Sequence, residues 1–143
     1  MQGEIFFQLF LATLLGAIIG FEREYKKRQA GLQTYSLVAL GTCLFTLLAF
    51  EFFDSFAIKA GISFDPSRIV LAIAVGIGFI GGGVIFQKGD RIEGLTTAAG
   101  LWATAAIAIA VGGKFYFQAI FATFLVLLIL VGFGELEKKV LKR

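Results

Sequence analysis

Five long apolar runs without a single charged residue dominate this sequence. An α-helix rises about 1.5 Å per residue, so roughly 17–25 apolar residues are needed to cross the ~30 Å hydrocarbon core of a bilayer. The runs are Ile5–Phe21, Thr34–Phe50, Ile69–Phe86, Leu95–Val111 and Phe115–Gly134. The sequence therefore predicts an all-α integral membrane protein, a bundle of five transmembrane helices in a single domain over residues 1–143.

Composition excludes several classes of function. Hydrophobic residues make up 58% of the chain and the mean hydropathy is +0.88, whereas soluble domains are about 45–50% apolar. The chain has no His and one Cys, which excludes His-based catalytic triads, HExxH zinc sites and internal disulfides. The net charge of +3 is too small to indicate nucleic acid. We therefore expect a protein embedded in lipid, without enzymatic activity and without a nucleic-acid partner.

The basic residues predict an orientation. The loops Glu22–Gln33 and Gln87–Gly94 and the C-terminal tail together carry ten Lys and Arg residues. The opposite side carries only three, Lys59, Arg68 and Lys114. Cytoplasmic loops are enriched in Lys and Arg, so the N-terminus is predicted outside and the C-terminus in the cytoplasm.

The loop Glu51–Arg68 is long enough to contain structure. Phe52, Phe53, Phe56 and Ala60 recur at helical spacing within it. This pattern predicts a short interfacial helix between the second and third spans.

Small residues predict where the helices pack. Within lipid, close helix contact depends on residues such as Gly and Ala. The glycines in question are Gly16 and Gly20 in the first span, Gly76, Gly78, Gly81, Gly82 and Gly83 in the third, and Gly100 in the fourth. The crowded third span has two interpretations, tight packing or a broken helix whose backbone lines a passage or contacts a ligand.

A polar cluster, Glu22-Arg23-Glu24, ends the first span. In one interpretation the helix continues past the membrane. Glu22 then forms an ion pair with Lys26 and Glu24 with Arg28, each four residues further along the helix. In the other, Glu22 turns into the mouth of the bundle, where it binds a cation or holds a buried arginine.

Two further polar groups adjoin the later spans. Asp65 and Arg68 precede the third span, where they either start the helix or line an outer vestibule. Thr96 and Thr97 open the fourth span, where their hydroxyls either cap the helix or contact a ligand.

Several motifs together resemble the MgtC/SapB family of bacterial inner-membrane proteins. They are Leu15–Glu24, Ala30–Thr34, Asp65–Ile69, Gly76–Gly83 and Gly94–Trp102. The resemblance implies a multi-pass inner-membrane protein linked to low-magnesium adaptation and, in pathogens, to virulence through survival inside host cells. It also implies membrane-protein partners such as the ATP synthase and sensor kinases. The sequence departs from the family at Gln33-Thr34-Tyr35, where arginine, threonine and histidine are expected, and no counterpart is expected for the C-terminal soluble domain of longer members.

Two functions follow as hypotheses. The first is a non-enzymatic regulator that acts on membrane proteins, with Glu22, Arg23, Asp65, Arg68 and the glycines holding its active conformation. The alternative is a transporter or sensor of magnesium or another divalent cation, in which Glu22 and Asp65 contact hydrated Mg²⁺. A homodimer is expected because five short helices can hardly enclose a pore.

Overall fold

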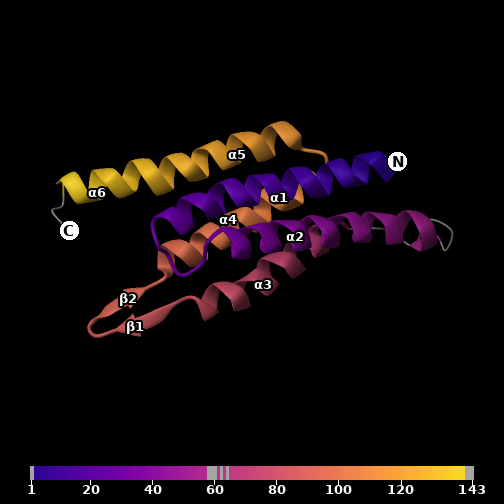
Figure 1. The fold of residues 1–143 in the computed structure, drawn as a ribbon. Coiled ribbons are helices and arrows are strands. Elements are labelled where there is room, and N and C mark those ends of the chain that lie inside the picture. Colours follow the sequence, from indigo (N-terminus) through magenta and orange to yellow (C-terminus); the bar gives the residue numbers. More distant parts are fainter. Residues whose placement is uncertain (1, 58–60, 62, 64, 141–143) are drawn as a thin grey trace.

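Long helices packed side by side form this protein, whose computed structural model describes residues 2–57, 61, 63 and 65–140 (Figure 1). In chain order the elements are α1 (Gln2–Tyr25), α2 (Leu32–Phe52), the π-helical η1 (Phe53–Ala57), α3 (Ser67–Gly83), β1 (Phe86–Lys88), β2 (Arg91–Glu93), α4 (Leu95–Gly112), α5 (Tyr116–Leu128), the π-helical η2 (Ile129–Phe133) and α6 (Gly134–Val140). Figure 1 shows α5 and α6 as one extended rod at the edge of the bundle, joined through η2.

Four of the described helices are long and apolar enough to cross a membrane. They are Gln2–Tyr25, Leu32–Ser55, Leu95–Gly112 and Tyr116–Leu136. The third apolar run forms the shorter α3, whose 17 residues extend about 25 Å. Its predicted end at Phe86 is wrong, because the helix ends at Gly83 with Val84 as its C-cap and Phe86 belongs to β1, where it pairs with Glu93 of β2. The length and composition of these helices support the membrane prediction, whereas five crossings remain a prediction.

The predicted interfacial helix does not form a separate element. Instead, α2 runs without a break into η1 and reaches Ala57. The backbone N–H of Phe53 still bonds to carbonyls of the preceding turn, because no Pro or Gly interrupts the chain there. Ala60, the last residue of the predicted helix, lies outside the described residues.

A two-stranded hairpin departs from the all-α prediction. β1 and β2 pair antiparallel, with Lys88 opposite Arg91. Gly89 allows the turn because its φ is +61°, in the left-handed region that glycine tolerates. The hairpin projects beyond one end of the bundle, close to the turn that joins α1 and α2 (Figure 1).

The core lies where α1, α2 and α4 meet. α1 packs along α2, and both contact α4, whereas α3 rests mainly on α4 and scarcely touches α2. The packing interpretation is confirmed at Gly16, Gly20 and Gly100. A methyl group at Gly16 would lie 2.6 Å from the Ala39 side chain, and one at Gly20 would lie 2.8 Å from the Leu32 backbone.

The glycine-rich α3 is a continuous helix, so the broken-helix interpretation is wrong for this structure. Among the five glycines of α3, only Gly81 has a neighbour in the described chain, because a methyl group there would lie 3.5 Å from the Ala98 side chain, an ordinary van der Waals distance. Methyl groups at the other four glycines of α3 would meet nothing within 4 Å of the described chain; these are Gly76, Gly78, Gly82 and Gly83. Most of these glycines therefore face the outside of the bundle.

Candidate functional site

The polar cluster predicted at the end of α1 surrounds a buried arginine. Arg23 lies in the last turn of α1 with only 2% of its side chain exposed, and its Nε donates to the Glu22 carboxylate. Glu22 is itself only 12% exposed. A buried cation is costly unless it is paired, so Glu22 holds Arg23 as the second interpretation of this cluster predicted.

Lys26 connects this pair to another helix. Its Nζ lies 2.8 Å from Glu22 Oε1, as the first interpretation predicted, and donates to the Leu130 carbonyl at 3.1 Å. The N–H of Gly134, which would bond to Leu130 in a regular α-helix, bonds to Val131 instead. Leu130 belongs to η2, so the bond from Lys26 binds the end of α1 to the segment that follows α5.

Glu24 does not use the predicted partner Arg28. α1 ends at Tyr25, and Lys27 adopts a left-handed conformation with φ of 54°, so the helical spacing needed for that pair is lost. The Glu24 carboxylate instead accepts the backbone N–H of Leu32 at 3.1 Å, at the start of α2. Gly31 permits this approach because a methyl group there would overlap Glu24 Oε2.

A second network, partly buried, lies beside the cluster and joins α4 to α2 and to the α1–α2 turn. The Tyr35 hydroxyl donates to the Thr97 carbonyl at 3.2 Å, and the Thr97 hydroxyl donates to Gln29 Oε1 at 3.0 Å. Tyr35 is fully buried against Gly100. Thr97 therefore links α4 to α2 through its carbonyl and to the α1–α2 turn through its hydroxyl, and it does not cap α4, while Thr96 is exposed.

Asp65 and Arg68 lie apart from this cluster. Asp65 Oδ1 accepts the N–H of Ser67 at 3.0 Å and its hydroxyl at 2.7 Å, and these bonds hold the pKa of the Asp65 carboxyl below its usual value. Arg68 Nε lies 3.8 Å from Asp65 Oδ2, and both side chains are exposed. The helix-start interpretation is therefore confirmed only in part, because Asp65 binds Ser67, the first residue of α3, but Pro66 occupies the N-cap position that was predicted for Asp65.

The proposed magnesium ligands are not brought together. Glu22 lies where α1 approaches the hairpin, whereas Asp65 precedes the other end of α3 (Figure 1). Both Glu22 oxygens face cationic side chains, and the described residues contain no group of three His, Cys, Asp or Glu able to hold a metal. A Mg²⁺ ion at Glu22 would have to displace Arg23 or Lys26.

Sequence reasoning missed the buried Gln8. Its side-chain amide donates to the carbonyls of Val111 and Gly112 at 3.0 and 3.1 Å. These carbonyls end α4, where helical donors are lacking. A search of the apolar runs for charged residues overlooks Gln8 because glutamine is uncharged. The signal that could have identified it is a side-chain amide within an otherwise apolar run.

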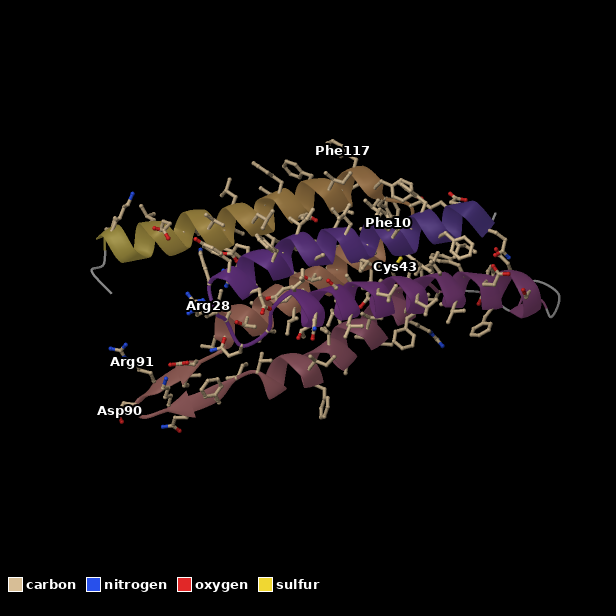
Figure 2. All side chains as sticks on the ribbon, in the orientation of Figure 1. Phe10, Arg28, Cys43, Asp90, Arg91 and Phe117 are labelled. Carbon is tan, nitrogen blue, oxygen red and sulfur yellow. The ribbon has the colours of Figure 1, made fainter. Side chains whose placement is uncertain are left out.

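The charged groups divide between the two ends of the bundle. Figure 2 shows Arg28 at the same end as Asp90 and Arg91 of the hairpin, while Phe10 and Cys43 lie toward the other end. At that other end Lys114 Nζ lies 2.9 Å from Glu4 Oε1, which raises the pKa of Lys114. The buried Arg23 thus belongs to the strongly basic end.

Comparisons with known proteins agree with the sequence motifs. Residues 9–139 match the MgtC family. The chain is 41% identical to protein SapB of Bacillus subtilis over 91% of its length, and 41% identical to protein MgtC of Brucella abortus over 78%. It is 35% identical over its whole length to the YhiD protein of Escherichia coli strain K12, whose name proposes magnesium transport.

The match covers only part of each relative. The chain spans 56% of the length of SapB, 44% of MgtC and 66% of YhiD. No solved structure matches the chain.

Proposed function

This chain is a member of the MgtC family, and from that premise we propose that it supports bacteria at low magnesium by binding other proteins of the inner membrane, without carrying ions itself. Magnesium enters the proposal through the family and through the name of YhiD. The geometry of the α1 cluster, formed by Glu22, Arg23 and Lys26, supports this mode of action.

The state of Glu22 is the observation that carries this proposal. A carboxylate on an ion path must be free to exchange ligands, yet Glu22 is held between Arg23 and Lys26. Lys26 in turn fixes the segment that follows α5 through the Leu130 carbonyl. The cluster therefore acts as a link between helices, which keeps one conformation of the bundle.

The outer face of α3 supports binding to other membrane proteins. Gly78 and Gly82 are exposed one helical turn apart, with open space where a side chain would stand. Small residues at this spacing allow another helix to approach closely. A partner protein or a second copy in a homodimer fits this requirement.

Divalent-cation transport or sensing is the alternative function, and the name of YhiD favours it. In that case Glu22 would release Lys26 and bind hydrated Mg²⁺ in another conformation. Mg²⁺ needs few carboxylates because it retains most of its waters.

Magnesium flux into proteoliposomes separates the two functions. Purified protein and its Glu22→Ala variant are reconstituted beside empty vesicles, and an ionophore control verifies that the vesicles are sealed. The same genes are tested for growth of a strain that lacks its own family member at micromolar magnesium. We expect rescue of growth by the native chain and flux equal to that of empty vesicles.

The two measurements have distinct contrary outcomes. Flux that exceeds the empty vesicles and disappears in Glu22→Ala would overturn the regulator proposal in favour of transport. Failure of the native chain to rescue growth, although it is inserted in the membrane, would contradict the role at low magnesium.

A further inference from the structure

An apolar groove lies between α2 and α3. It encloses about 900 Å³, within the range of about 300–1,000 Å³ typical of small-molecule sites. The groove exists because α3 packs on α4 and leaves a gap toward α2. Among the residues that line it are Leu37, Gly41, Phe45, Arg68, Ile73 and Gly76.

Two glycines, which have no side chain, keep the groove open. Gly41 lies on the wall formed by α2 and Gly76 on the wall formed by α3. A methyl group at either glycine would meet nothing within 4 Å. The packing of the chain therefore does not require these glycines, whereas the width of the groove does.

A single cation marks one end of the lining. Arg68 stands there with 87% of its side chain exposed, and its nearest acid, Asp65, is 3.8 Å away. The lining on α3 beyond Arg68 is entirely apolar. A guanidinium can donate two parallel hydrogen bonds to a phosphate, so the groove combines one anion-binding group with an apolar channel.

The length of the groove indicates which kind of ligand it can hold, a lipid chain or a transmembrane helix. Its lining on α3 extends from Arg68 to Ile80, twelve positions or about 18 Å. One leaflet of the hydrocarbon core is about 15 Å thick, half of the whole. A transmembrane helix of a partner would need a surface of about 30 Å. The groove thus fits a chain that enters from one leaflet.

We propose that this groove binds an anionic phospholipid, with an acyl chain between α2 and α3 and the headgroup phosphate at Arg68. The site is independent of the α1 cluster and of the proposed function.

Retention of lipid by the purified protein tests the proposal. Native mass spectrometry would compare dioleoyl phosphatidylglycerol with dioleoyl phosphatidylcholine, which has the same chains and no net charge. Gly76→Leu and Gly41→Leu each fill the groove from one wall. Gly132→Leu is the matched control, because Gly132 also faces open space but does not line the groove. Circular dichroism verifies that each variant is folded.

We expect the native protein and Gly132→Leu to retain phosphatidylglycerol at least fivefold more than phosphatidylcholine. Gly76→Leu and Gly41→Leu should retain at least fivefold less of the anionic lipid. Arg68→Gln should lower its retention to that of phosphatidylcholine. Equal retention by the native protein and both groove variants would overturn the proposal. A dimer of the native protein that disappears in both groove variants but persists in Gly132→Leu would also overturn it, in favour of a second copy in the groove.

Discussion

Gly20 and Gly78 lie in different surroundings, although both belong to predicted stripes of small residues. A methyl group at Gly20 would lie 2.8 Å from the Leu32 backbone and 2.9 Å from Tyr35 Cβ, whereas one at Gly78 would meet nothing. Overpacking costs about 1–3 kcal/mol, and Ala favours a helix by about 1 kcal/mol over Gly. The two substitutions should therefore have opposite effects on the free energy of unfolding.

We predict that Gly20→Ala destabilises the protein by about 1–2 kcal/mol and that Gly78→Ala stabilises it by up to about 1 kcal/mol. Reversible unfolding in mixed micelles, followed by circular dichroism, measures both. A Gly20→Ala variant as stable as the native protein would show that α1 and α2 can separate without cost.

Gln8 offers a second prediction at the residue scale. Gln8→Leu removes the two hydrogen bonds to the carbonyls that end α4, and interhelical hydrogen bonds in membranes contribute about 0.6 kcal/mol on average and up to about 1.7. We expect a loss of about 1–2 kcal/mol in the same unfolding measurement. Gln118→Leu is the control, because Gln118 is exposed on α5. Equal effects of the two changes would contradict the role of Gln8.

At the residue scale, the sequence predicted a side-chain contact correctly where the two partners are close together in the chain. The pair of Glu22 with Lys26 could be predicted because the two residues are four positions apart, and the structure confirms it. The buried arginine of the other interpretation was not identified from the sequence, and the structure shows that it is the adjacent Arg23. Tyr35 and Gln8 could not be assigned, because their partners are 62 and more than 100 residues away. Such contacts depend on which helices are neighbours, and a single apolar run carries no information about its neighbours.

At the scale of elements, Lys26 is the side chain that links α1 to η2. Lys26→Met preserves the length of the side chain but removes the donor to Leu130 and the cation beside Glu22. We predict faster hydrogen exchange of the backbone amides in η2 and the first turn of α6, because this end of the helix loses its attachment.

Exchange followed by mass spectrometry on the reconstituted protein measures this effect. Lys139→Met is the control, because Lys139 is exposed on α6. Unchanged exchange of residues 129–136 in Lys26→Met would show that η2 is held by packing alone.

Element boundaries were predictable only where the apolar pattern and the backbone end together. The first apolar run ends close to the last residue of α1, and the fourth ends close to the last residue of α4. The third run continues through Ile85 and Phe86, but α3 stops at Gly83, after three successive glycines that weaken a helix. Hydropathy records which residues avoid water, and it therefore could not separate the end of α3 from the start of β1.

At the scale of the whole molecule, the positions of the described basic residues and the directions of the helices agree with the orientation predicted from the loops. The α1–α2 turn, the hairpin and α6 lie at one end of the bundle, and the N-terminus lies at the other (Figure 1). Arg23, Lys26 and Arg28 at the first end match the excess of basic residues expected in the cytoplasm. The arrangement depends on α3 crossing the membrane, although its length of about 25 Å is below the usual ~30 Å.

Labelling of single cysteines tests this arrangement. Cys43 is fully buried and is replaced first by Cys43→Ala. Gly3→Cys, Asp90→Cys and Lys139→Cys are then introduced one at a time at exposed positions near the N-terminus, in the hairpin turn and in α6. We predict that a membrane-impermeant maleimide labels Gly3→Cys in intact spheroplasts, but labels Asp90→Cys and Lys139→Cys only after permeabilisation. Labelling of Asp90→Cys together with Gly3→Cys in intact cells would mean that α3 does not cross, because α1 and α2 alone return the chain to the side where it began.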